Sequence, residues 1–297
     1  MSGATTGTKG TAAVGDLEIA YETFGSPEAE PLLLVMGLGG PMTWWDSEFC
    51  AQLADAGFYV IRYDNRDAGR STKIRAKVKQ SQVVRAFLGL KVKPPYTVSD
   101  MAADGIGLLT ALGIDRAHIV GMSMGGMIVQ TMAIEHPSRV LSLTSIMSTT
   151  GGRLVGWQHP AVLRTILAAK SGEEAYYTHA ARMWSLIGSP AYADAPESIR
   201  KRAEDTWEYG VSQSGTGRQT LAILTQPNRT RALGDVTAPT LVIHGLSDKM
   251  VHVSGGRATA MAIPGSELLL IKGMGHDLPE PLWPTFITAI RRNADRA

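Results

Sequence analysis

The chain has 297 residues, 44% of them hydrophobic and 19% charged, and a formal net charge of +2. This length and composition are ordinary for a globular enzyme that is either one large domain or a core with an insertion. The single cysteine, Cys50, excludes an intrachain disulfide, and no apolar run of about 18 residues is present to form a membrane span.

The first ten residues are small and polar. They lack the apolar segment of a signal peptide, so we expect a cytoplasmic protein. Residues 1–10 are predicted to form a disordered tail.

Short apolar or alternating runs recur along the rest of the chain and predict β-strands. They lie at 17–24, 32–36, 59–63, 117–120, 140–146, 240–244 and 268–271. Helical patterns lie between most of them, such as those at 98–112, 125–135 and 283–292. Strands that alternate with helices predict an α/β fold with a mostly parallel central sheet and helices on both faces. Ligands bind such sheets at the carboxyl ends of the strands.

Residues 73–93 carry seven Lys or Arg residues and no acid. Within this segment Val83, Val84, Phe87 and Leu88 fall at helical spacing. A basic amphipathic helix can bind an anionic membrane surface, so peripheral membrane contact is one interpretation. We favour the other, a helix that packs against the fold and leaves a basic face in solvent. Nucleic-acid binding is disfavoured because a single basic segment, without further basic surface, is too small for a typical nucleic-acid site.

The alternation of strands and helices stops between residues 151 and 232. This stretch has no clear strand and several helical patterns, among them 161–170, 175–186 and 198–207. We therefore predict a helical cap over 151–232, inserted after the sixth strand of a core formed by 11–150 and 233–297. A cap excludes water and shapes the substrate pocket.

The most informative motif is G-x-S-x-G at residues 121–125, with Ser123 at its centre. A short apolar strand precedes it and a helix follows it, which is the setting of a nucleophile elbow. The flanking glycines keep Cβ atoms away from the sharp turn, and the serine is then exposed at the end of its strand. Ser123 is the candidate nucleophile.

A serine hydroxyl needs a base, normally a histidine oriented by a carboxylate, and on an elbow of this kind the carboxylate and then the histidine follow the serine. His276 follows the strand at 268–271, and glycines beside it let the chain turn back over the strand ends. Asp248 follows the strand at 240–244, whereas the loop after 140–146 holds no carboxylate. We predict that Asp248 and His276 complete the triad.

The other histidines fit the role of base less well. His118 lies within a strand, and His136 precedes a proline at a helix end. His244 and His252 flank the acid loop, and both are interpreted as structural, with a position on the pocket rim as the alternative for His252.

An oxyanion hole requires two backbone N–H donors, one after the nucleophile and one from an earlier loop. Met124 supplies the first. The glycine-rich loop at 37–40 follows the strand at 32–36, and by position we assign the second donor to Leu38. This loop lacks the G-K-[ST] and G-x-G-x-x-G patterns of nucleotide sites, and we expect neither a cofactor nor a metal.

Together these motifs resemble the α/β-hydrolase superfamily over most of the chain. The segments 63–71 and 135–140 match its pattern as well, as the turn after the fourth strand and the entry to the sixth. Within the superfamily, the segments 35–37 and 63–67 look like the group that contains aclacinomycin methylesterase and related actinobacterial carboxylesterases and lipases. Many members have His-Gly where this chain has Met36 and Gly37. The donor is a backbone N–H, so the change affects how the loop is held rather than abolishing the hole.

The residues and the resemblance imply a cofactor-independent serine esterase that acts on apolar carboxylic esters. Methionines crowd the motif loops and favour an adaptable apolar pocket, although core packing explains Met127 and Met147 better. These methionines are Met36, Met122, Met124, Met127, Met147, Met250 and Met274. A lipid-directed lipase or phospholipase, a thioesterase and a cofactor-free perhydrolase would keep the same triad and stay open as alternatives. A ligand receptor on the same fold is the non-enzymatic alternative.

Overall fold

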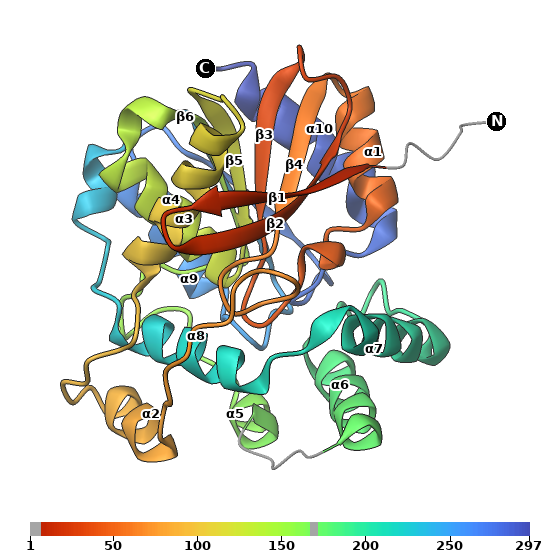
Figure 1. Ribbon diagram of the computed structural model, residues 1–297, viewed down its shortest axis with the longest axis vertical. Helices are drawn as coiled ribbons and strands as arrows, with labels where there is room; N and C mark the ends of the chain where they lie inside the picture. The colour runs from red at the N-terminus through yellow and green to blue at the C-terminus, as the bar shows by residue number, and fades with distance from the viewer. Residues whose placement is uncertain (1–6, 167–171) are drawn as a thin grey trace.

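The computed structural model describes residues 7–166 and 172–297, which build an eight-stranded sheet flanked by helices (Figure 1). The strands are β1 (Thr8–Val14), β2 (Leu17–Phe24), β3 (Glu30–Val35), β4 (Phe58–Tyr63), β5 (Ala117–Met122), β6 (Val140–Ile146), β7 (Thr240–Gly245) and β8 (Glu267–Ile271). Their order across the sheet is β1-β2-β4-β3-β5-β6-β7-β8. The β1–β2 and β2–β4 pairs are antiparallel, and the other pairs are parallel. The predicted mostly parallel sheet is confirmed.

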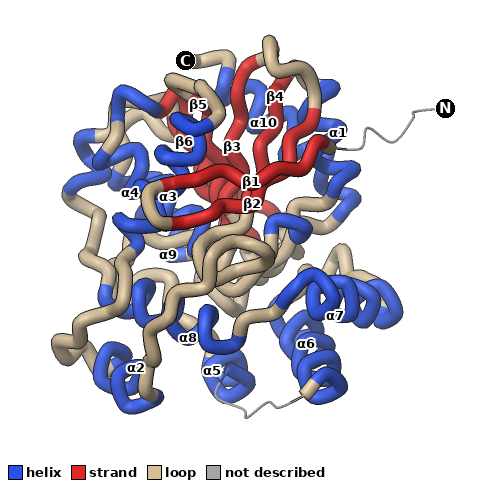
Figure 2. The backbone as a smooth tube through the Cα atoms, in the orientation of Figure 1, coloured by secondary structure: helices blue, strands red, loops and turns tan. Residues whose placement is uncertain are grey.

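Helices cover both faces of the sheet and enclose an apolar core on each (Figure 2). One face carries α1 (Ser47–Asp55) and α10 (Trp283–Ala294), and the other carries α3 (Val98–Ala111), α4 (Met124–Glu135) and α9 (Ser254–Ala262). Short 3-10 helices lie at η1 (Met42–Trp44), η2 (Pro137–Arg139), η3 (Ala232–Asp235) and η4 (Glu280–Leu282). Because both faces are covered, every residue of β5 and β7 is buried, which explains their continuous apolar runs.

The predicted helical insertion after β6 is confirmed, and Figure 1 shows its helices together below the sheet in this view. It contains α5 (Pro160–Ile166), α6 (Glu173–Ile187), α7 (Pro196–Gly210) and α8 (Gln213–Thr225). Residues 167–170 of the first predicted cap helix lie outside the described residues. The helix α8 was not recognised because Gly215 and Gly217 lower its helix propensity. Gly215 is needed there, since a Cβ on it would lie 2.4 Å from the Asp67 carbonyl oxygen.

The amino-terminal strand begins earlier than expected. Residues 1–10 were predicted as a disordered tail, but β1 starts at Thr8, which pairs with Thr23 of β2. The small residues that suggested disorder serve packing instead, because a Cβ on Gly10 would lie 2.5 Å from the ring of Tyr21. Residues 1–6 of the predicted tail lie outside the described residues.

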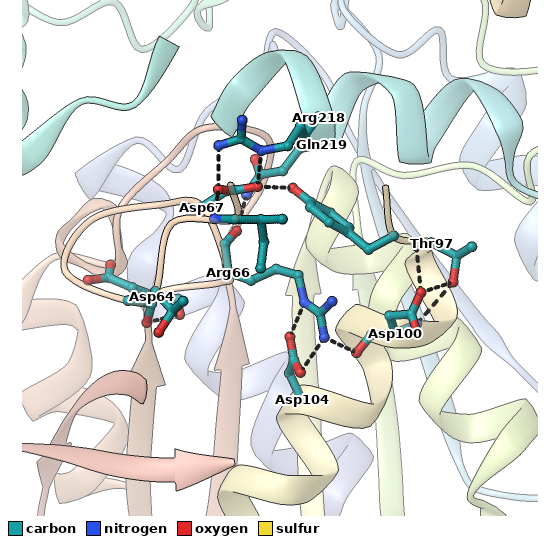
Figure 3. Close-up of polar contacts among 12 residues, drawn as sticks. Asp64, Arg66, Asp67, Thr97, Asp100, Asp104, Arg218 and Gln219 are labelled. Carbon is teal, nitrogen blue, oxygen red and sulfur yellow. Dashed lines mark hydrogen bonds and ion pairs between the residues drawn. The ribbon is translucent and has the colours of Figure 1, made fainter. Parts of the chain in front are cut away.

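A buried ion pair joins the insertion to the core. Asp67 follows β4 in a left-handed conformation (φ 71°), and its carboxylate accepts two hydrogen bonds from Arg218 of α8, at 2.7 and 2.8 Å (Figure 3). It also accepts bonds from the Tyr96 hydroxyl at 2.6 Å and the Ile74 N–H at 2.8 Å. Burial alone would raise the pKa of Asp67, but the hydrogen bonds from Arg218, Tyr96 and Ile74 outweigh it and lower that pKa. The pair fixes α8 over the loop that follows β4.

We expect Arg218→Met to lower the free energy of unfolding by about 3–5 kcal/mol, because it leaves the Asp67 carboxylate buried without its cation. Urea unfolding monitored by circular dichroism measures this. The matched control is Arg200→Met on α7, whose side chain is 52% exposed and pairs with Glu174 on the surface. That variant should unfold like the wild type. Equal effects of the two substitutions would show that the buried pair of Arg218 and Asp67 stabilises the fold no more than a surface pair does.

Candidate active site

The turn between β5 and α4 holds Ser123 in a strained conformation. Its backbone has φ 58° and ψ −118°, a combination that residues with a side chain adopt only when their surroundings impose it. A Cβ on Gly121 would lie 2.1 Å from the Gly125 carbonyl oxygen, and a Cβ on Gly125 would lie 1.9 Å from the Val35 carbonyl oxygen. The predicted strand, sharp turn and helix are therefore present, and both motif glycines are required by close backbone approach.

The structure brings the three predicted triad residues together at the carboxyl ends of their strands. Nε2 of His276 lies 3.0 Å from the Ser123 hydroxyl oxygen, and Nδ1 of His276 lies 2.7 Å from a carboxylate oxygen of Asp248. Asp248 comes from the loop after β7 and His276 from the loop after β8. The result is a continuous hydrogen-bonded chain from carboxylate to imidazole to hydroxyl, the arrangement that activates a serine.

The Asp248 carboxylate is buried yet held in its charged form. Its Oδ1 accepts the backbone N–H groups of Met250, at 2.8 Å, and Val251, at 2.9 Å. Burial alone would raise the pKa of Asp248, but the nearby imidazoles of His276 and His244 lower it to about 2. A carboxylate that remains ionised orients the Nδ1–H tautomer of His276 and stabilises its cation.

A second histidine contacts the same carboxylate. His244 of β7 is fully buried, with Nε2 2.8 Å from the Val251 carbonyl oxygen and 3.4 Å from Oδ2 of Asp248. His244 therefore has the structural role expected of it, and its contact helps to position the Asp248 carboxylate. The signal in the sequence was its spacing of four residues from Asp248, at the end of the strand that carries the acid loop.

The predicted oxyanion residues flank the nucleophile on two elements. Met124 opens α4, so its N–H has no intrahelical acceptor. Leu38 lies in the loop after β3, and among the described residues its N–H donates no hydrogen bond. The preceding Gly37 approaches the nucleophile so closely that a Cβ on it would lie 3.2 Å from the Ser123 Cβ. Two N–H groups are thus free beside Ser123.

Residues that the sequence analysis missed hold the oxyanion loop. The Asn65 side-chain amide donates to the Met36 carbonyl at 2.9 Å, which secures the start of the loop. The Gly39 N–H donates to the Gln219 side chain of α8 at 2.8 Å. Gln219 in turn donates to the Arg66 carbonyl at 2.8 Å, so α8 connects the oxyanion loop with the loop after β4. These contacts hold the loop that carries Leu38.

The insertion also holds the loop of the catalytic-base candidate. The His276 N–H donates to the Ile187 carbonyl at 2.7 Å, and the Gly275 N–H donates to the Ser189 hydroxyl oxygen at 2.8 Å. The Ser189 hydroxyl and N–H both donate to the carboxylate of Asp277. Burial raises the pKa of Asp277, and the bonds from Ser189 oppose that rise. Ser189 and Asp277 therefore position His276, a role that sequence alone did not reveal.

The other histidines considered for the role of base make different contacts. His118 is buried in β5 with Nδ1 2.8 Å from the Ser142 hydroxyl, and burial lowers its pKa. His136 ends α4, as its position before a proline predicted. His252 stacks on Trp157 with ring centroids 4.1 Å apart and lines a pocket of about 330 Å³ that also contacts Asp248.

A larger open groove of about 1060 Å³ lies between α2 (Gln80–Phe87), the end of α8 and residues 149–158. Its wall includes Met127 of α4, Thr149 and Val251, which belong to the elements that carry or flank Ser123 and Asp248.

Most of the methionines expected near substrate are instead buried in the core. Met36, Met122, Met124 and Met274 pack there, and Met147 packs there as expected, whereas Met127 and Met250 line the groove. Met127, for which core packing is the favoured interpretation, both packs in the core and lines the groove.

Within the described part of the chain, no group of three or more His, Cys, Asp or Glu side chains is arranged to hold a metal ion. No helix in that part is both long enough and apolar enough to span a bilayer.

The chain belongs to the alpha/beta hydrolase fold family, whose sequence profile matches residues 30–280. A rhodomycin D methylesterase, DauP, from a Streptomyces species is 31% identical over 291 residues, which span 88% of this chain and 91% of that protein. The 3-oxoadipate enol-lactonase 2 of Acinetobacter baylyi is 27% identical over 267 residues, which span 89% of this chain and 88% of that protein. The crystal structure of the enol-lactonase from Burkholderia xenovorans superposes with a TM-score of 0.74 at 23% identity, covering 96% of this chain and 100% of that one. The protein is thus an α/β hydrolase whose relatives include methylesterases and enol-lactonases.

The low pKa of Asp248, about 2, predicts the shape of the acid limb of the pH profile. Above about pH 4, where free carboxylic acids ionise, Asp248 stays charged, so its own protonation does not add to the loss of activity as the pH falls. We expect log kcat/KM to fall with a limiting slope of one. A slope of two would show that the carboxylate titrates in the same range.

We expect Asp248→Asn to lower kcat by roughly 10⁴-fold, because an amide favours the wrong tautomer of His276. The matched control is Asp235→Asn, at an exposed carboxylate in η3, which should keep wild-type activity. Steady-state kinetics on a soluble ester compare the two. Full activity of Asp248→Asn would move the acid to another carboxylate.

Proposed function

We propose that this protein is a serine esterase that cleaves apolar carboxylic esters through an acyl-enzyme. The observation that carries the proposal is the chain from Asp248 through His276 to Ser123, with contacts of 2.7 and 3.0 Å, beside two backbone N–H donors. This combination supplies the nucleophile, base and oxyanion donors of acyl transfer.

In the first half-reaction, Ser123 Oγ attacks the ester carbonyl carbon as Nε2 of His276 takes its proton. The N–H groups of Leu38 and Met124 bind the oxyanion of the tetrahedral intermediate. His276 then gives the proton to the leaving alkoxide, the C–O bond breaks, and an alcohol departs. In the second half, water gives a proton to His276 and attacks the acyl carbon. The carboxylic acid leaves as Ser123 regains its proton.

The substrate class that fits best is an ester of a bulky apolar acid with a small alcohol. The groove of about 1060 Å³ slightly exceeds the usual range for small-molecule sites, so it offers room for a large acyl group. Rhodomycin D methylesterases, at 31% and 30% identity, are consistent with this class. We assign the acyl group to the groove and the leaving alcohol to the side of His276.

We expect Ser123→Ala to lower kcat by about 10⁴–10⁶-fold while the protein stays folded. The control is Ser185→Ala at an exposed position of α6, which should keep full activity. Circular dichroism checks that both variants fold. If Ser123→Ala kept more than about a tenth of the wild-type rate, another residue would be the nucleophile.

A substrate panel tests the acyl specificity. We expect kcat/KM to be higher for the methyl ester of a polycyclic aromatic acid than for an acetate ester, a thioester or a small lactone. Leu224→Trp, which adds bulk at the groove wall, should lower the ratio of kcat/KM for the polycyclic ester over the acetate by about tenfold or more. An unchanged ratio would show that the acyl group binds elsewhere.

A further inference from the structure

The helix α2 lies in the connection between β4 and α3 (Figure 1). A cluster of exposed apolar side chains lies on and beside it. The exposed fractions are 48% for Val84, 54% for Phe87, 65% for Leu88, 50% for Leu90 and 91% for Leu154. Leu154 belongs to this cluster because its neighbour Arg153 donates a hydrogen bond to the Phe87 carbonyl at 3.2 Å. Single exposed leucines are normal on a protein surface, but a cluster of this kind marks an interaction site.

The orientation of α2 explains why these side chains are exposed. The helix packs on α8, and Ala86 is buried while Val83 is half-buried. Val84, Phe87 and Leu88 stay exposed beside this contact. The expected packing against the fold is therefore present, but the outer face of α2 is apolar as well as basic.

Exposed cations surround the apolar cluster. They are Arg75, Lys77, Lys79, Arg85, Lys91, Lys93 and Arg153. Across the described residues, none of them pairs with a carboxylate. Lys73 is not part of this set, because its ammonium group donates to the carbonyls of Ala68, Gly69 and Ser71.

The sequence segments that build this side of the molecule carry no acidic residue. Residues 73–99, 151–166 and 209–234 contain neither Asp nor Glu, although the whole chain has 27 of them. The cations around α2 are thus not neutralised locally, and the face presents a positive field to a partner.

We propose that this basic apolar face, formed by α2, residues 88–93 and Arg153 with Leu154, docks on a lipid bilayer that contains anionic lipids. The cations attract the headgroup phosphates, and Phe87, Leu88 and Leu154 enter the boundary between headgroups and acyl chains. A nucleic acid or an acidic protein would satisfy the cations but leave the apolar side chains unburied. A bilayer is the occupant that matches both.

Docking in this orientation places the groove at the membrane. Phe87, Leu90 and Lys91 line both the groove and the basic apolar face. An apolar ester dissolved in the bilayer would then meet the groove without crossing water. This consequence rests on the proposed function, whereas the docking itself does not.

Vesicle flotation with ether-linked phospholipids tests the docking, because such lipids contain no ester for the enzyme to cleave. We expect the wild-type protein to float with vesicles rich in phosphatidylglycerol at low ionic strength, and to be released by high salt. It should not float with phosphatidylcholine vesicles. Failure to float with the anionic vesicles would overturn the proposal and leave the proposed esterase activity untouched.

Variants of the cations and variants of the apolar side chains separate lipid docking from general polyanion binding. The triple variant Arg85→Gln, Lys91→Gln, Lys93→Gln should weaken binding to anionic vesicles by on the order of 100-fold. The equally charged control Arg116→Gln, Arg257→Gln, Lys272→Gln changes exposed cations elsewhere and should bind like the wild type.

Phe87→Ser with Leu88→Ser should also weaken vesicle binding at least tenfold, whereas Met261→Ser, at an exposed site on α9 (84%), should not. If the serine double variant bound vesicles as tightly as the wild type, the face would be a site for polyanions and the docking on lipid would be wrong. Equal losses in the triple variant and its control would show that net charge alone governs binding, and would also overturn the proposal.

Discussion

The close approach of two backbones at the elbow is the constraint on which the site depends. Gly125 of α4 lies against the end of β3, where a Cβ would fall 1.9 Å from the Val35 carbonyl oxygen. This approach forces Ser123 into its strained turn, with φ 58°, and brings it beside the loop that follows β3. One contact therefore sets both the nucleophile and the oxyanion loop, which explains why the strain at Ser123 is retained.

The helical insertion supports the catalytic loops as well as covering them. Gln219 of α8 binds the oxyanion loop at Gly39, and Ser189 after α6 binds the loop of His276. The buried pair of Arg218 and Asp67 fixes α8 over the core. The positions of the candidate oxyanion donors and of the candidate base thus depend on residues of the insertion. Such support limits how far these groups move before reaction, which is the condition for electrostatic preorganisation.

Local signals explain how much of the fold and of the site could be predicted from the sequence. The runs at 17–24 and 140–146 coincide with β2 and β6, because strands buried on both faces or alternating along one face leave a clear pattern. Ser123, Asp248 and His276 could be predicted because each follows a strand. The helix α8 and the roles of Gln219 and Ser189 were not found, since they depend on contacts between distant segments. The bond from Gly39 to Gln219 spans 180 residues of sequence, and the bond from Gly275 to Ser189 spans 86.

The central claim is that Ser123 is a nucleophile activated through His276, and covalent labelling tests it most directly. A fluorophosphonate reacts with an activated serine and leaves a stable adduct that resembles the tetrahedral intermediate. We expect intact-mass spectrometry to show one adduct per chain, peptide mapping to place it on Ser123, and His276→Gln to slow its formation severely. An adduct on a different residue, or none on the folded wild-type protein, would contradict the claim.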